Sequence, residues 1–261
     1  QLLDEGWIWA EAGESPITHA MSDDIPEREK EVYLAQLAEQ AERYDEMAEH
    51  MRAACMFGQE FNERERNYLA VAYKQAVGQR RASWRIVSAV EAGEEAKGNH
   101  MTTASATGYR KKIETELKTL CQTILSLLAD LLIPNATSAE AKVSFFKAQG
   151  DYHRYIAEIS DDRERTGETK LAQKAYEEGT KIAEDALPVT NQFRLGLALN
   201  YAVFYYEVMQ KPTDAVRIGR KAFEDAVREI DNLGEESVKD SALVMQLLRD
   251  NLTLWTSEAA G

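Results

Sequence analysis

The chain has 261 residues and carries 31 Lys and Arg against 45 Asp and Glu, a formal net charge of −14. Because a surface this acidic repels nucleic-acid phosphates and anionic lipid, and no apolar run reaches the about 20 residues of a membrane span, we expect no nucleic-acid or membrane partner. Two cysteines are too few for a disulfide framework, which favours a reducing compartment. We therefore expect a cytoplasmic protein, with access to the nucleus left open.

Residues 1–26 differ from the rest of the chain. They contain Trp7-Ile8-Trp9 and two prolines, and they show no sustained helical pattern. This segment is either an N-terminal extension or sequence added for expression, and we set it apart from residues 27–261, which we expect to form one helical domain.

From Glu27 to Ile133 the sequence contains no proline, and its apolar residues recur at helical spacing, as in Leu34, Leu37, Ala38 and Ala41. No run alternates polar and apolar residues over the length of a strand. The sequence therefore predicts an all-α fold of about nine helices starting near Glu27. Loops are expected at residues 57–59, 93–108, 133–138, 160–167, 186–191, 209–213 and 232–234, the stretch from Gly98 to Gly108 being a flexible loop of small residues.

Two of the expected helices carry a charged face. Lys74 and Arg81 are seven residues apart and so share one side of a helix. Further along, one face carries Lys147, Asp151, Arg154 and Glu158 at i, i+4, i+7 and i+11. Taken alone, the first is usually a solvated basic edge, and the second a solvated face whose opposite charges pair with one another.

Two later helices carry polar residues on faces that are otherwise apolar. Asn200 and Glu207 lie in a segment so rich in bulky apolar residues that it should be buried, so both require partners. Asn251 interrupts a row of leucines, where an amide often bonds a neighbouring helix. Together the four faces suggest a groove with cations for an anion on one wall and leucines and amides for an extended peptide on the other.

At these residues the chain resembles the 14-3-3 family of phosphopeptide-binding adaptors. The matching blocks include RNYLAVAYKQAV at 66–77, RRASWR at 80–85, GDYHRY at 150–155, RLGLALNYAVFYYE at 194–207 and KDSALVMQLLRDNLTLWTS at 239–257. They run in order through residues 30–257. The resemblance implies nine antiparallel helices, cup-shaped dimers with one groove in each protomer, and phosphorylated client proteins or peptides as partners.

The resemblance also implies roles for single residues. The phosphate pocket would consist of Lys74, Arg81, Arg154 and Tyr155. The peptide-binding residues would be Lys147, Leu199, Asn200, Val203, Glu207, Leu243, Val244, Leu247, Asn251, Leu254 and Trp255. Within that set, Asn200 and Asn251 would clamp the peptide backbone. Ser144, His153 and Val238 stand where the family has aromatic residues, a departure that bears on peptide preference and removes no phosphate ligand.

The implied dimer forms through the first helices of the chain. Its residues would be Leu37, Ala41, Arg43 and Tyr44 on one side and Tyr109, Lys112 and Glu116 on the other, with an Arg43–Glu116 ion pair between them. We expect a homodimer and leave heterodimers open. Ser83 follows two arginines near this interface and is either a regulatory phosphorylation site or a small residue packed beside Trp84.

Two other classes of protein remain as alternatives. An enzyme is not expected, because no His follows a Glu by three positions, neither a P-loop nor a dinucleotide fingerprint occurs, and the segments around Cys55 and Cys121 are typical of core cysteines. We therefore expect no metal and no cofactor. A general helical-repeat scaffold without phosphate dependence is closer, although the sequence lacks the repeat of about 34 residues that such a scaffold needs.

Overall fold

The computed structural model describes residues 26–229 and 235–258, with side chains in the last helix from Ser241 onward. The predictions for residues 1–25, for a loop at 232–234 and for Val238 lie outside these residues. The helices are α1 (Glu27–Gln40), α2 (Tyr44–Cys55), α3 (Glu63–Ala96), α4 (His100–Leu127), α6 (Ala139–Ile159), α7 (Asp162–Ala186), α8 (Gln192–Glu207), α9 (Pro212–Glu229) and α10 (Glu235–Glu258). Between α4 and α6, a π-helical turn (Leu128–Leu132) and the three-residue α5 (Ile133–Asn135) extend α4.

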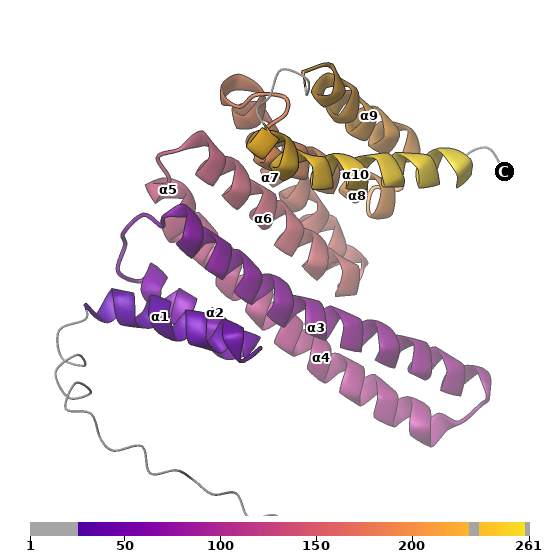
Figure 1. Cartoon of the computed structure of the whole chain (residues 1–261). Coiled ribbons are helices and arrows are strands. Elements are labelled where there is room, and N and C mark those ends of the chain that lie inside the picture. Colours follow the sequence, from indigo (N-terminus) through magenta and orange to yellow (C-terminus); the bar gives the residue numbers. More distant parts are fainter. Residues whose placement is uncertain (1–25, 230–234, 259–261) are drawn as a thin grey trace, which may run out of the picture.

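With these two pieces counted as the end of α4, the described residues form nine helices and no strand, as the sequence predicts. The helices succeed one another across the molecule, from α1 and α2 at one end to α9 and α10 at the other (Figure 1). Side-chain caps start four of them, since Asn62, Ser138, Asp161 and Asn191 each accept hydrogen bonds from the first backbone N–H groups of the following helix.

The expected loop from Gly93 to Gly108 is wrong. α3 continues to Ala96, Gly98 makes the turn at φ +72°, and α4 begins at His100. The Thr and Ser side chains that suggested a loop instead bond backbone carbonyls of the helix and its cap, as Thr103 does to Asn99 and Thr107 does to Thr103. Glu91 of α3 accepts further bonds from Thr107 and Arg110 of α4, which joins the two helices into a long hairpin (Figure 1).

Two other expected loops are shorter than predicted. Residues 160–167 contain a break only at Ser160 and Asp161, because the Asp161 side chain caps the next helix at once. In residues 133–138 the helix runs on to Asn135, with Pro134 in the short α5.

α6 stands between the two halves of the core. Its Phe145, Tyr152 and Ile156 join a large cluster with α1 to α4, whereas Val143 joins Tyr176, Leu197 and neighbours in α7 and α8. At Gly150 a Cβ atom would come within 2.6 Å of the Tyr176 ring. Glycine therefore lets α6 and α7 approach closely, and this approach brings the Tyr176 hydroxyl to the charged face of α6.

Both cysteines are buried, which confirms that Cys55 and Cys121 belong to the core. By length and hydropathy alone, one described helix, His100–Asn135, would suit a membrane span. Its Leu117, Cys121 and Ile124 are core residues, and the core helix of a folded domain meets the same two criteria.

Candidate functional site

Asp151 is the centre of the charged face of α6. Its buried carboxylate accepts hydrogen bonds from Lys147 Nζ at 3.0 Å, Arg154 Nη2 at 3.3 Å and Tyr176 OH at 2.6 Å. Asn200 Nδ2 of α8 donates to both carboxylate oxygens, at 2.9 and 2.8 Å. One carboxylate therefore holds three residues of the predicted site, Lys147, Arg154 and Asn200, in a single arrangement contributed by α6 and α8.

The charges in this cluster stabilise one another. Burial alone would raise the pKa of Asp151, but Lys147 and Arg154 outweigh it and lower that pKa. Burial likewise opposes protonation of Lys147, and the Asp151 carboxylate again prevails and raises the pKa of the Lys147 ammonium group. Both residues are therefore ionised at neutral pH. The expected pairing is confirmed for Lys147, Asp151 and Arg154. The expectation that the face is solvated is wrong, because Asp151 and Arg154 are buried.

Arg81 of α3 reaches the same face from the other side. Its guanidinium lies 3.9 Å from the centroid of the Tyr155 ring, and the guanidinium of Arg154 lies 4.7 Å from it. Tyr155 therefore contacts both cations. Glu158 compensates Arg81 through a 2.8 Å bond from Arg81 Nε and also bonds Arg85. Burial alone would raise the pKa of Glu158, but the two arginines have the larger effect, so the pKa is lowered.

Glu207, at the end of α8, is exposed, although the sequence predicts that it is buried. Its side chain is 56% exposed and its Oε2 lies 3.5 Å from Arg154 Nη1. The helix ends at this residue, so the apolar pattern of α8 does not enclose it. Arg154 and Glu207 line a cavity of about 250 Å³ together with Arg85, Glu158 and Arg165. This cavity adjoins Arg81 through Glu158 and gives the charged cluster an opening to solvent.

Lys74 lies two turns before Arg81 on α3 and is exposed. The described residues offer its ammonium group no hydrogen-bond or ion-pair partner. No contact joins Lys74 to Arg81 or Arg154, so the structure places it on the predicted face of α3 without bringing it against the other cations. An exposed, uncompensated cation remains available to an anionic ligand.

The predicted apolar wall lies on α8 and α10. Leu243, Leu247 and Leu254 are exposed, at 68%, 45% and 51% of their surfaces. The structure leaves Leu199, Val203, Val244 and Asn251 partly buried. Exposed leucines in a row on one helix are costly in water, which is typical of a surface that binds an apolar ligand. Trp255 differs from the prediction, because it is buried and stacks on Tyr206, and so supports the wall from within.

Three residues that organise the cluster are absent from the site predicted from sequence. Asp151 and Glu158 belong to the charged face of α6 and could have been included on that signal. Tyr176 lies alone in α7 and carries no pattern that points to Asp151. Of the departures from the family, His153 bonds Glu168 of α7 through Nδ1 at 2.6 Å, so it belongs to the contact between α6 and α7.

The residues predicted for the dimer interface lie on the surface of the protomer. Leu37 and Tyr109 are 41% and 58% exposed, and Ile86 and Val90 of α3, which the sequence analysis did not include, are 66% and 53% exposed. Within the protomer, Arg43 pairs with Glu46. Glu116, which is also predicted for the interface, lies near Arg80, with 3.5 Å between Oε2 and Nε. The exposed Ser83 donates its hydroxyl to the carbonyl of Gln79, one turn earlier in α3.

Comparisons with known proteins agree with this fold. The family model described as 14-3-3 protein matches residues 34–256. The chain is 52% identical to 14-3-3-like protein GF14 iota of Arabidopsis thaliana over 89% of this chain and 87% of that protein. It is 53% identical to Protein BMH1 of Saccharomyces cerevisiae over 88% and 87% of the two chains. With Checkpoint signal transducer rad24 of Schizosaccharomyces pombe it shares 52% identity over 89% and 86%.

Proposed function

Because the chain belongs to the 14-3-3 family, we propose that it holds client proteins by a phosphoserine or phosphothreonine seated on the cations of α3 and α6. As a member of that family the protein is a phosphopeptide-binding adaptor and not an enzyme. The arrangement around Asp151 and Glu158 is the observation that carries the residue-level proposal, since it holds Arg81 and Arg154 against the same ring, that of Tyr155.

The phosphate would bind the guanidinium N–H groups of Arg81 and Arg154 that do not already bond Asp151 or Glu158. A guanidinium has five donors, and Arg154 uses its own in bonds of 3.3 to 3.5 Å, longer than the about 2.7–2.9 Å of a strong charged pair. Such bonds exchange readily for a dianionic phosphate, which offers more charge and three acceptor oxygens. Tyr155 supplies a hydroxyl beside Arg154. Lys74 adds a cation without a competing acid.

The peptide backbone would then bind Asn200 and Asn251. Asn200 gives its amide N–H groups to Asp151, which leaves its Oδ1 to accept from a peptide N–H. The exposed leucines of α10 would contact the side chains of the peptide. We propose that both binding and client choice are set in this way, with the phosphate supplying affinity and the leucine wall supplying preference.

Members of this family form dimers. We propose a homodimer in which Leu37 of α1 in one protomer packs against Tyr109 of α4 in the other, with Ile86 and Val90 of α3 widening the contact. The exposure of all four apolar side chains supports this proposal, because large exposed patches of this kind are usually covered. The predicted Arg43–Glu116 pair would replace the partners that each has within its protomer.

We further propose a cytoplasmic protein with neither a membrane nor nucleic acid as partner, which the net charge of −14 supports.

Fluorescence polarisation with one labelled peptide in two forms tests the proposal. The phosphoserine peptide should bind, and its unphosphorylated twin should bind at least about tenfold more weakly, because charge-assisted hydrogen bonds to the phosphate are lost. Equal affinity for the two forms would favour the helical-repeat scaffold, which has no use for a phosphate.

A further inference from the structure

A second cavity lies between α7, α8 and α9 and shares no lining residue with the charged cluster. Its volume is about 220 Å³. Its floor is apolar and rigid, because Ala183, Leu195 and Leu197 are each 1% exposed and belong to the core of the C-terminal half. Pockets for drug-sized ligands measure about 300–1,000 Å³. A ligand of this cavity is therefore small and has an apolar part.

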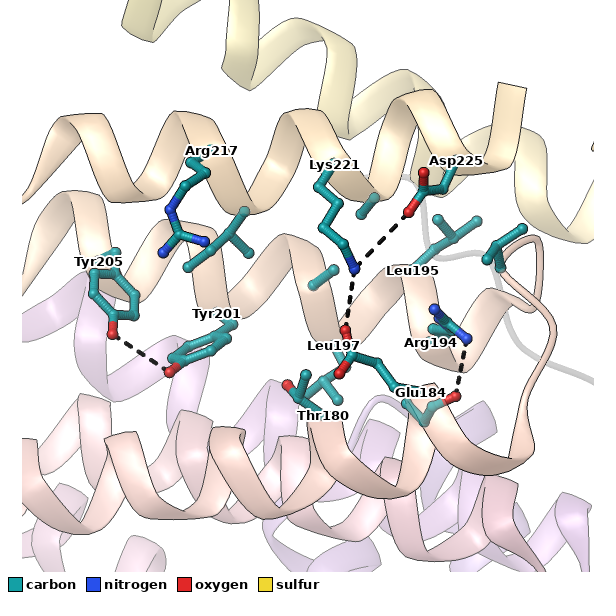
Figure 2. Close-up of a pocket in the computed structure, with 15 residues that line it drawn as sticks. Thr180, Glu184, Arg194, Leu195, Leu197, Tyr201, Tyr205, Arg217, Lys221 and Asp225 are labelled. Atoms are coloured by element: carbon teal, nitrogen blue, oxygen red, sulfur yellow. Dashed lines mark hydrogen bonds and ion pairs between the residues drawn. The ribbon is translucent and has the colours of Figure 1, made fainter. Parts of the chain in front are cut away.

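One end of the cavity is polar and carries a cation with donors to spare. In Figure 2 the guanidinium of Arg217 on α9 extends toward Tyr201 and Tyr205 of α8. Arg217 Nη2 bonds Asp214 at 3.1 Å, and its Nε and Nη1 have no hydrogen-bond partner among the described residues. Tyr201 donates to the Tyr205 hydroxyl at 3.5 Å, which leaves the Tyr205 hydroxyl hydrogen free to donate as well. This end offers donors, so it suits an acceptor that carries negative charge.

The other two cations that line the cavity already have partners. Lys221 of α9 pairs with Glu184 of α7 at 3.1 Å and lies 3.9 Å from Asp225. Arg194 gives Nη1 to the carbonyls of Ala183 and Leu187 at the end of α7. Because Glu184 and Asp225 occupy Lys221, the donors left for a ligand anion are those of Arg217 that do not bond Asp214. Because Lys221 and Glu184 are exposed, their bridge between α7 and α9 is weak and opens easily for an entering ligand.

We propose that this cavity binds small amphipathic carboxylates, with the carboxylate on Arg217 and Tyr205 and the alkyl chain on the floor of Leu195 and Leu197. The site is separate from the phosphopeptide groove in its residues and in its chemistry. A monocarboxylate with a short chain suits both the volume and the donors that Arg217 keeps beside its pair with Asp214.

Methyl NMR of the full chain, titrated with hexanoate, tests this site directly. Hexanoate should shift the Leu195, Leu197 and Ile218 methyl signals saturably, and saturating phosphopeptide should leave these shifts in place. Hexylammonium, which has the same chain and the opposite charge, should bind about tenfold more weakly, because it forgoes the charge-assisted bonds to Arg217. Shifts of groove residues alone, abolished by the phosphopeptide, would overturn the proposal.

Two arginines of α9 provide a matched pair of variants. Arg217→Gln should lower hexanoate affinity about tenfold and remove the preference over hexylammonium, since the charged donors are lost. Arg220→Gln removes the same charge from the same helix at an exposed position outside the cavity and should change neither. Equal effects of the two variants would contradict a specific site. Both should bind phosphopeptide as the unmodified protein does, so that failure of this proposal is distinguishable from failure of the proposed function.

Discussion

Replacement of Asp151 by Asn removes the carboxylate on which the predicted phosphate-binding cluster is built. The side chain keeps its shape but loses its charge and one acceptor oxygen. Its new N–H₂ group faces donors at either position, those of Lys147 and Asn200 at one oxygen or those of Arg154, Tyr176 and Asn200 at the other. Breaking a buried ion pair by changing one partner costs about 3–5 kcal/mol. We expect the lower end of this range, because Arg154 keeps Glu207 and Tyr176 as partners.

Urea unfolding followed by circular dichroism measures this loss in the free energy of unfolding, and thermal unfolding measures the matching change in melting temperature. For a chain of this size each kcal/mol lowers the melting temperature by about 2–4 °C, so the variant should melt about 6–12 °C earlier. Asp185→Asn, at an exposed position of α7 without a partner among the described residues, is the control and should leave stability unchanged. A loss below about 1 kcal/mol for Asp151→Asn would refute the reasoning, since one exposed pair would account for it.

The same variant has a pH dependence of known sign. Because the pKa of Asp151 is lowered in the folded protein, its stabilising contribution is fully present above the ordinary value of about 4 and is lost as pH falls through the lowered one. The difference in stability between the unmodified protein and Asp151→Asn should therefore be constant from pH 8 to pH 5 and shrink below about pH 4. A difference that grew on acidification would have the wrong sign.

Three further predictions concern other parts of the molecule. In fluorescence polarisation, Asn200→Ala should lower the affinity for phosphopeptides of different sequence to a similar extent, whereas the effect of Leu247→Ala should vary with the peptide. The reverse result would contradict the roles of Asn200 as a backbone clamp and of Leu247 as a side-chain contact. Ser83→Glu should shift the protein toward monomer in native mass spectrometry while Ser83→Ala stays dimeric, and a wholly dimeric Ser83→Glu on dilution would refute the switch. Because burial raises the pKa of Cys55 and Cys121 to about 12, iodoacetamide should label neither at pH 8 until urea unfolds the chain; rapid labelling of the folded protein would show that a thiol is accessible.

Sequence periodicity predicts the fold class and the helix count because each helix has one apolar side that packs locally. It fails between Gly93 and Gly108, where Thr and Ser look like loop residues but bond back to the helix, and where Glu91 binds them from α3. That contact joins residues of two helices, and composition read in a short window cannot include it. Within this stretch, only the turn at Gly98 is indicated by its residue type.

The site shows the same division. Spacing places Lys147, Asp151 and Arg154 on one face of a helix, and the structure confirms their pairing. The same spacing could not reveal that Tyr176 reaches Asp151, because this depends on the close approach of α6 and α7 at Gly150. The residues of the site follow from local pattern, and their fixed geometry follows from packing between distant segments.

The charge reversal Lys74→Glu tests the central claim most directly. Lys74 is exposed and has no partner among the described residues, so the variant should fold normally, and Lys170→Glu on α7, likewise exposed and without such a partner, is the matched control. The affinity of a phosphoserine peptide should fall at least about tenfold for Lys74→Glu, because a charge-assisted bond becomes a repulsion, and should stay unchanged for Lys170→Glu. Unchanged affinity of the Lys74→Glu variant in the same titration would contradict the assignment of the phosphate to this face of α3.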